Sequence, residues 1–331
     1  MPRLSPKENL LRAIRYDDPE WVPRCNEPTM VGIAYEGNFR VACWTDAWGT
    51  HWETTRDDMV PFPKGHPLPS LDALAEFAFP DPDVMFVLSE DAKSCLARAE
   101  KEDQLIFGQQ TYLLFERAWA LMGMEAFMEA FYTHPEEMHE LLGRITDYNI
   151  RIFERYMEAG CHGVSFSEDL GAQRSLMISP DLWRRFFMPQ YARAFEPVKR
   201  AGGLINFHSC GCVQDIVDDL VALGVDILNP IQARANDLAM LKRVAHGRMA
   251  LQGGVDTQHL LMLGTPDEVA IEVRRLIDLL APGGGYIIGP DQGMPFPPAN
   301  LQALWRTAAE YGRYDAPHLR EQRAPACRQT P

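Results

Sequence analysis

The chain has 331 residues, 46% of them hydrophobic and 24% charged, which is typical of a globular protein with a large buried core. A net charge of −14 and a pI near 5.1 argue against a nucleic-acid surface, which needs clustered Lys and Arg, and give no support for docking on anionic lipid. No window approaches the roughly 18 apolar residues of a membrane span, and the first residues lack the apolar core of a signal peptide. We therefore expect a cytoplasmic protein that acts on a small molecule or a protein partner.

The first hundred residues have an irregular pattern that predicts a helix and a hairpin. An amphipathic helix is expected over residues 8–16, and residues 41–53 read as a hairpin. Trp44, Trp48 and Trp52 all stand at even-numbered positions, so their side chains would fall on one face of such a strand. They would either pack at the edge of the core or contact a ligand. Residues 61–82 are rich in proline and predict a connecting segment.

From residue 104 onward, short apolar runs alternate with helical patterns. The runs indicate strands buried on both faces, and their rhythm predicts parallel strands joined by right-handed crossovers. The sequence therefore predicts an α/β protein, with a (β/α)₈ TIM barrel favoured over a doubly wound sheet because no G-x-G-x-x-G follows a strand. We expect one domain over residues 1–331, with an irregular N-terminal part (1–100) and a loose tail (315–331). The clearest strands are residues 105–108, 163–166, 203–207, 225–229, 249–253 and 286–289.

His208 and Cys210 follow one of these strands and precede a helix. Side chains at i and i+2 of an extended segment point to the same side, so the two could hold one metal ion with the borderline-soft ligand mix that zinc prefers. The alternative is a buried structural cysteine beside an unrelated histidine. A strand-to-helix turn is where α/β proteins place function, which favours the metal site. His162 precedes a strand and is expected to be structural, and the remaining histidines, His51 among them, show no partner signature.

Polar side chains near other strand ends are further candidates. Gln109 and Asp169 lie where they could orient a substrate. Asp256 follows another strand and is either a site residue or a helix N-cap. Glu116 is expected on a solvated or capping face of its helix.

Six segments stand in a recognisable order along the chain. They are residues 5–16 with 18–23, Asp46-Ala47-Trp48-Gly49, residues 179–191, His208-Ser209-Cys210-Gly211, Leu251-Gln252-Gly253-Gly254-Val255-Asp256, and residues 286–298. Taken in this order, they resemble the uroporphyrinogen decarboxylase superfamily and, within it, the branch of cobalamin-dependent methyltransferases. The resemblance spans most of the chain, and it implies a (β/α)₈ barrel, in agreement with the pattern of strands and helices.

The chain departs from true uroporphyrinogen decarboxylases near its N-terminus. Those enzymes resemble one another through an Arg-rich segment that holds the carboxylates of the substrate. Residues 23–30 match that segment here, and Arg24 is their only cation. One Arg in an acidic protein is poor complementarity for a polycarboxylate, so porphyrinogen decarboxylation is not expected.

The methyltransferase branch is similar at His208 and Cys210, which fall where those enzymes place two zinc ligands. The resemblance implies a third ligand, a Cys after the last strand, but Asp291 or Gln292 stands at its place here. Glu168 could complete the site from its own strand end, and Asp291 could supply an oxygen from the last loop. Cys212 is less favoured because it begins the next helix. We expect His208, Cys210 and Glu168 as the metal ligands.

The resemblance implies zinc-assisted methyl transfer to or from cobalamin. Zinc lowers the pKa of a bound thiol, alcohol or phenol. The chain shows no D-x-H-x-x-G cobalamin motif, so the corrinoid is expected on a partner protein. Because the third Cys is missing, we favour demethylation of a small methyl ether, which could be aromatic, over activation of a thiol. The expected catalytic residues are Glu168, Asp169 and Asp291, and the expected substrate contacts are Gln109, Trp48, Phe166, Asp256 and Gln292.

Two other functions stay open. One is a lyase or decarboxylase that acts without metal on a small carboxylated substrate, through Asp and Arg groups. The other is a non-catalytic barrel that binds or escorts a corrinoid or tetrapyrrole.

Overall fold

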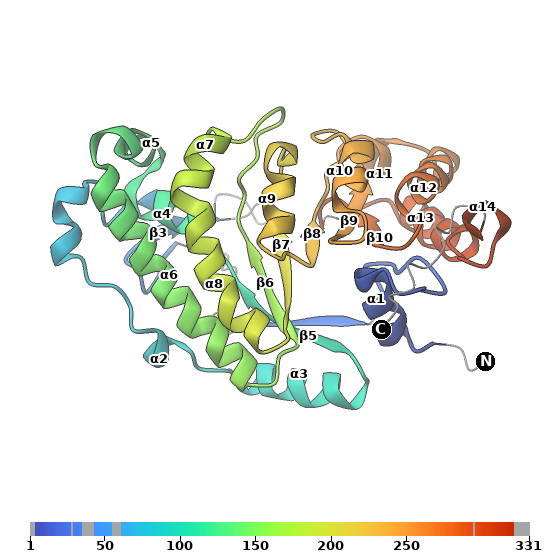
Figure 1. Cartoon of the computed structure of the whole chain (residues 1–331), viewed down its shortest axis with the longest axis horizontal. Coiled ribbons are helices and arrows are strands. Elements are labelled where there is room, and N and C mark those ends of the chain that lie inside the picture. The colour runs from blue at the N-terminus through green and yellow to red at the C-terminus, as the bar shows by residue number, and fades with distance from the viewer. Residues whose placement is uncertain (1–3, 28, 35–42, 55–60, 294, 321–331) are drawn as a thin grey trace, which may run out of the picture. The chain divides into compact units, whose positions relative to one another are not determined.

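A computed structural model describes residues 4–27, 29–34, 43–54, 61–293 and 295–320 (Figure 1). Its contacts divide the chain into two compact units. Unit 1 comprises Met1–Met30, Leu170–Met177 and Asn206–Pro331, and unit 2 comprises Val31–Asp169 and Ile178–Ile205. The expectation of one domain over the whole chain stays a prediction.

Unit 2 contains parallel strands followed by helices. β5 (Leu105–Gln110) pairs with β6 (Gly163–Ser167) in a register that sets Gly108 opposite Val164, and β1 (Met30–Ala34) is next to β5 in strand order. Helices α6 and α8 contact each other along their lengths (Figure 1). The helices of this unit are α2 (Pro82–Met85), α3 (Glu90–Lys101), α4 (Phe115–Met122), α5 (Met124–Thr133), α6 (Pro135–Glu158), α7 (Pro180–Leu182), the π-helical turn η2 (Trp183–Phe187) and α8 (Met188–Arg200).

The core of unit 2 follows from the spacing of apolar residues. In α6 the buried positions Met138, Leu141, Ile145, Tyr148 and Ile152 recur every three or four residues, which gives one apolar face. This face and its neighbours enclose a cluster of aromatic rings with centroids 5.0–6.4 Å apart. The rings are those of Phe115, Phe127, Phe131, Phe186 and Phe187.

The predicted hairpin is present in the described part of residues 41–53. β2 (Trp44–Thr45) pairs antiparallel with β3 (His51–Glu53), whereas Val41 and Ala42 lie outside the described residues. Trp44 lies opposite Trp52, and the two rings stack. The proline-rich segment was predicted as a connection, but it adds a third strand, β4 (Phe62–Gly65), and the 3₁₀ helix η1 (Leu71–Glu76). Pro63 is tolerated there because β4 is an edge strand.

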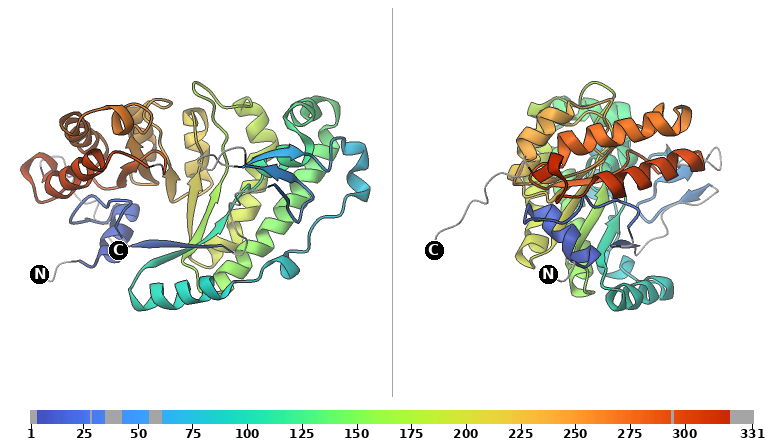
Figure 2. Two further views of the ribbon diagram at one scale, coloured as in Figure 1. Left: turned by 180° about the vertical axis from the view of Figure 1, so that it is seen from behind. Right: turned by 90° about the vertical axis from the view of Figure 1, so that its right-hand side faces the viewer.

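Unit 1 contains the end of β7 (Leu204–His208) and the strands β8 (Ile227–Asn229), β9 (Ala250–Val255) and β10 (Tyr286–Pro290), all parallel. Figure 2 shows α12 and α13 side by side, as their contacts require. α12 begins with a capping box between Thr265 and Glu268. The helices of this unit are α1 (Pro6–Arg15), η3 (Gln214–Ile216), α9 (Val217–Ala222), α10 (Leu238–Ala245), α11 (Leu260–Leu263), α12 (Pro266–Leu280), α13 (Pro298–Tyr311) and α14 (Pro317–Arg320).

The predicted α/β class and the repeat of strand and helix are confirmed. Among the described residues, seven strands take part in the parallel arrangement (β1 and β5 to β10), one fewer than the closed eight-stranded barrel that the sequence predicts. At the start of the tail that was expected to be loose (315–331), α14 forms and His318 stacks on Tyr311 at 4.0 Å, whereas residues 321–331 lie outside the described part of the chain. Within the described ranges, we find no helix with both the length and the apolar character of a membrane span.

Candidate functional site

The end of β7 brings an imidazole and a thiol together. Phe207 is fully buried and His208, the last residue of the strand, pairs with Asn229 of β8. The Nε2 atom of His208 lies 3.6 Å from the Sγ atom of Cys210, and both residues are half-buried. Gly211 then turns the chain with a φ of 82°, a conformation that favours glycine. The expectation that i and i+2 side chains converge at this strand end is met.

Gln292 reaches the same sulfur from the loop after β10. Its amide nitrogen donates to Sγ of Cys210, and its side chain is half-buried. Asp291 instead turns into unit 1, where its carboxylate accepts hydrogen bonds from the backbone amides of Gly254 at 2.7 Å and Ala233 at 3.3 Å. Burial raises the pKa of Asp291 to about 7. Of the two residues at the place of the missing cysteine, Gln292 is therefore the one that contacts Cys210.

The loop that carries Cys210 is fixed by polar side chains that the sequence reasoning missed. Ser209 accepts a hydrogen bond from the backbone amide of Leu170 at 3.0 Å. Asn236 is buried, donates to the carbonyl of Gly211 at 3.0 Å and accepts from the amide of Val213 at 2.9 Å. Since an Asn bonded to the backbone at both its ends leaves little freedom, the loop is held in one conformation. The position of Asn236 in the sequence, just before α10, gave no indication of this role.

Glu168 of unit 2 lies in a dense network of donors. Its carboxylate accepts from the backbone amides of Leu114 at 3.0 Å, Phe115 at 2.7 Å and Glu116 at 3.2 Å, which form the start of α4, and from the hydroxyl of Tyr191. Burial raises its pKa to about 7, while these hydrogen bonds act in the opposite direction. The carboxylate therefore anchors the N-terminus of α4. Its role as a metal ligand stays a prediction, and it would require some of these bonds to be exchanged.

A second buried carboxyl group accompanies Glu168. Glu116 was predicted on a solvated or capping face, but it is 7% exposed and accepts a hydrogen bond from the hydroxyl of Ser167 at 2.6 Å. Burial raises the pKa of Glu116 to about 8, helped by the charges of Asp169 and Glu168. Unit 2 thus holds a group of carboxyl side chains that can keep protons at neutral pH. The catalytic roles of Glu168, Asp169 and Asp291 stay predictions.

The aromatic candidates lie in packed surroundings. Trp48 is 3% exposed, with its ring against Tyr148 and beneath the guanidinium of Arg117 at 4.9 Å. Phe166 is buried and its ring stacks with Phe153 and Phe195. A substrate contact at either position would require this packing to open, so both roles stay predictions.

Gln109 and Asp256 differ in the groups through which they are hydrogen-bonded. Gln109 is exposed, and its backbone carbonyl accepts a hydrogen bond from the hydroxyl of Tyr156 at 2.6 Å. The carboxylate of Asp256 accepts from the backbone amides of Gln258 at 2.9 Å and His259 at 3.3 Å, which forms an Asx turn ahead of α11. Because the N-cap of α11 is His259, Asp256 does not take the helix N-cap role, and its role in the site stays a prediction.

The donors at the end of β7 fit a zinc ion. Two ligands of a tetrahedral zinc, one nitrogen and one sulfur, are about 3.6 Å apart, given Zn–N near 2.0–2.1 Å and Zn–S near 2.3 Å. His208 and Cys210 already stand at 3.6 Å. An imidazole and a thiolate are also the donor types that zinc prefers. Cys212 does not compete, because it is 2% exposed and burial raises the pKa of its thiol.

The family of the chain follows from comparison with known proteins. The model of the family uroporphyrinogen decarboxylase (URO-D) matches residues 64–311, well over half of the chain. The chain belongs to the uroporphyrinogen decarboxylase family. This confirms the superfamily that the sequence motifs indicated.

Curated members of the uroporphyrinogen decarboxylase family match parts of the chain. The uroporphyrinogen decarboxylase of Xanthomonas euvesicatoria pv. vesicatoria is 30% identical over 156 residues, 46% of this chain and 41% of that protein. The enzyme of the same name from Azoarcus sp. is 24% identical over 193 residues, 55% of this chain and 50% of that protein. The chain thus spans half or less of the length of these relatives.

A solved structure shares the fold across almost the whole chain. A methyltransferase from Methanosarcina mazei superposes with a TM-score of 0.73 and 20% identity, covering 93% of this chain and 99% of that one. At this identity the likeness shows a common fold.

Proposed function

We propose that the protein is a methyltransferase that moves a methyl group between a small methyl ether and the corrinoid of a partner protein, with zinc held by His208 and Cys210. The observation that carries the proposal is the approach of Nε2 and Sγ to 3.6 Å at the end of β7, with Gln292 against the sulfur. The fold shared with the methyltransferase from Methanosarcina mazei supports it. The corrinoid partner and the ether substrate come from the sequence resemblance.

Gln292 offers a third donor within unit 1. Its amide nitrogen lies against Cys210, and turning the amide by a half-turn would put Oε1 there instead. Glu168 and Asp291 have their oxygens engaged by backbone amides, so Gln292 can reach an ion with less rearrangement. Asp291 then supports the loop of Gln292 by fixing it to Gly254. The ligand set of the proposal is His208, Cys210 and Gln292, in place of the expected Glu168.

This ligand set bears on the direction of the reaction. When bound, zinc supplies a Lewis acid that stabilises a developing oxyanion or lowers the pKa of a coordinated group. One thiolate with two neutral donors leaves more positive charge at the site than several thiolates would. Such a site suits the departure of an ether oxygen better than the activation of a thiol. His208, Cys210 and the loop held by Asn236 would supply positioning.

A metal-independent decarboxylase is the second candidate function. The curated relatives are named uroporphyrinogen decarboxylases, and the buried Glu116 and Glu168 can exchange protons near neutral pH because their pKa values are about 8 and about 7. Against it stands Arg24, whose guanidinium already pairs with Glu27 at 2.9 Å. A cation neutralised in this way is a weak partner for a polycarboxylate.

The decisive experiment measures metal and turnover together. The protein is purified without chelator, and methylation of cob(I)alamin is followed with a panel of methyl ethers, thioethers and methylamines. We expect His208→Ala and Cys210→Ser to lose one zinc equivalent and turnover, while Cys95→Ser, a cysteine on α3, keeps both. Decarboxylation of a carboxylated substrate that survives His208→Ala would overturn the proposal in favour of the lyase. Binding of a corrinoid protein with no methyl transfer to any compound would instead indicate a scaffold.

A further inference from the structure

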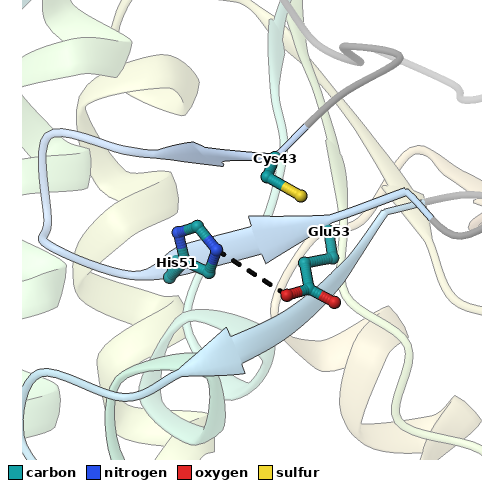
Figure 3. Close-up of side chains that lie close together, drawn as sticks. All are labelled: Cys43, His51 and Glu53. Atoms are coloured by element: carbon teal, nitrogen blue, oxygen red, sulfur yellow. Dashed lines mark ion pairs between the residues drawn. The ribbon is translucent and has the colours of Figure 1, made fainter.

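The β2–β3 hairpin of unit 2 has one apolar face and one face with metal-ligating groups. Trp44 lies opposite Trp52, and because side chains alternate along a strand, their neighbours project to the other side. That other side carries Cys43, Thr45, His51 and Glu53. The ligating atoms of Cys43, His51 and Glu53 all lie within 4.8 Å of one another. Figure 3 shows the three side chains directed toward a common point.

The imidazole of His51 is oriented for this arrangement. Thr45 lies opposite it across the hairpin, and its hydroxyl is 3.3 Å from Nδ1 of His51. Nε2 is therefore the nitrogen directed at Glu53, whose Oε1 lies 3.8 Å away. This separation is too long for a hydrogen bond and close to the roughly 3.4 Å between a nitrogen and an oxygen that share a tetrahedral zinc. A hydrogen bond to the second nitrogen is the usual way in which proteins orient a ligating histidine.

The hairpin beneath these side chains is held firmly. Trp52 is 2% exposed, stacks on Tyr112 at 4.6 Å and donates from Nε1 to the carboxylate of Asp46 at 3.0 Å. Gly65 of β4 lies opposite His51, and a side chain there would come within 2.9 Å of its Cβ atom. Glycine at position 65 therefore leaves room for the imidazole. A ligand set on a fixed strand needs little reorganisation to bind an ion.

We propose that Cys43, His51 and Glu53 form a second metal site, which binds Zn²⁺ and lies outside the catalytic machinery. A thiolate, an imidazole and a carboxylate are three accepted zinc ligands, and the thiolate disfavours Mg²⁺ and Ca²⁺. The two anionic ligands balance the charge of the ion. The side chains of His51 and Glu53 are 41% and 39% exposed, which leaves the fourth position to water. The ion would link Cys43, the residue before β2, to β3 and stabilise the hairpin.

The test uses the full chain with Cys210→Ser, so that the site at β7 contributes no thiolate. Cobalt(II) added to this metal-free protein should give the near-ultraviolet absorption of a thiolate-to-cobalt transition, and zinc should abolish it by displacement. Adding Cys43→Ser should remove the band, and adding His51→Ala should weaken binding at least about tenfold. Adding Cys95→Ser instead is the matched control and should leave the band unchanged.

Hydrogen exchange gives a second readout that does not depend on cobalt. Zinc should slow exchange of the amides in residues 44–53 of the Cys210→Ser protein, and it should have no such effect once Cys43→Ser is added. Absence of the cobalt band from the Cys210→Ser protein, or its persistence with Cys43→Ser, would overturn the proposal. The result is separate from the proposed function, because loss of zinc at His208 would leave the hairpin band in place.

Discussion

The hydroxyl of Tyr191, on α8, donates a hydrogen bond to the buried carboxylate of Glu168, which follows β6. The same carboxylate accepts from three backbone amides at the start of α4. One side chain thus connects a strand end, the start of one helix and the side of another. Several charge-assisted hydrogen bonds to one buried group make it a point on which the local structure depends.

Replacing Tyr191 by Phe should destabilise the protein. The change keeps the ring and removes a hydrogen bond to a buried charged group, so we expect the free energy of unfolding to fall by about 1.5–3 kcal/mol. Urea denaturation at pH 8 measures it, because Glu168, with a pKa of about 7, is ionised there. Tyr132→Phe is the control, because Tyr132 on α5 is 75% exposed and its change should stay within about 0.5 kcal/mol. Equal stability of the two variants would show that Tyr191 and Glu168 are not bonded in solution.

The stability of the protein should decrease as the pH rises from about 5 to about 8. Burial raises the pKa of Glu116 to about 8 and that of Glu168 to about 7, both from an ordinary value of 4.5. In this window the folded state therefore binds protons that the unfolded state has released. The stability that these two groups contribute is fully present below their pKa in the unfolded state. It is lost as the pH rises through their pKa values in the folded state.

The free energy of unfolding should fall by at most about 1.4 kcal/mol per pH unit for each of these two groups. Urea unfolding at several pH values measures it, and Glu116→Gln should flatten the part of the curve above pH 7. A free energy of unfolding that rises across the window would contradict the assignment of these raised pKa values.

The sequence predicts those features of the fold and the site that depend on residues close together in the chain. The strands after residue 104 were recognisable because each is a short apolar run, and the approach of His208 to Cys210 follows from the alternation of a strand. The environment of Glu168 could not be predicted, because its donors come from α4 and α8, far away in the sequence. Glu116 was misplaced for the same reason.

The hairpin shows a finer limit of sequence reasoning. His51 and Glu53 are two residues apart, so their side chains lie on the same face of β3. Only the pairing register decides which residue of the other strand lies beside them. The turn between β2 and β3 sets that register and places Cys43 beside them. A single sequence with irregular spacing around a five-residue turn carries no clear signal of this pairing.

Asp46 should be essential for the hairpin. Its carboxylate accepts from the backbone amides of Trp48 at 3.0 Å and Thr50 at 2.9 Å, and it pairs with Arg117 at 2.6 Å. The side chain of Arg117 is 4% exposed. Asp46→Asn would leave a buried cation without its counter-charge, which costs about 3–5 kcal/mol. Thermal or urea unfolding tests this against Asp72→Asn, whose side chain is 83% exposed.

Gln292→Cys should strengthen zinc binding at the end of β7. Gln292 already contacts Sγ of Cys210, so a thiolate at position 292 has a short path to the same ion. A soft anionic ligand binds zinc more tightly than a neutral amide, and we expect an affinity gain of at least about tenfold. Competition with a chromophoric chelator measures the affinity, in protein that carries Cys43→Ser so that the hairpin does not contribute.

The matched control for this variant is Gln258→Cys, which adds a thiol at an exposed position of the same unit. It should leave the zinc affinity unchanged. If Gln292→Cys raises the affinity, the additional thiolate also lowers the positive charge of the site. Methyl transfer from ethers should then become slower, and methyl transfer to a thiol should become faster. An unchanged affinity would mean that position 292 does not face the ion, and the ligand set of His208, Cys210 and Gln292 would have to be abandoned.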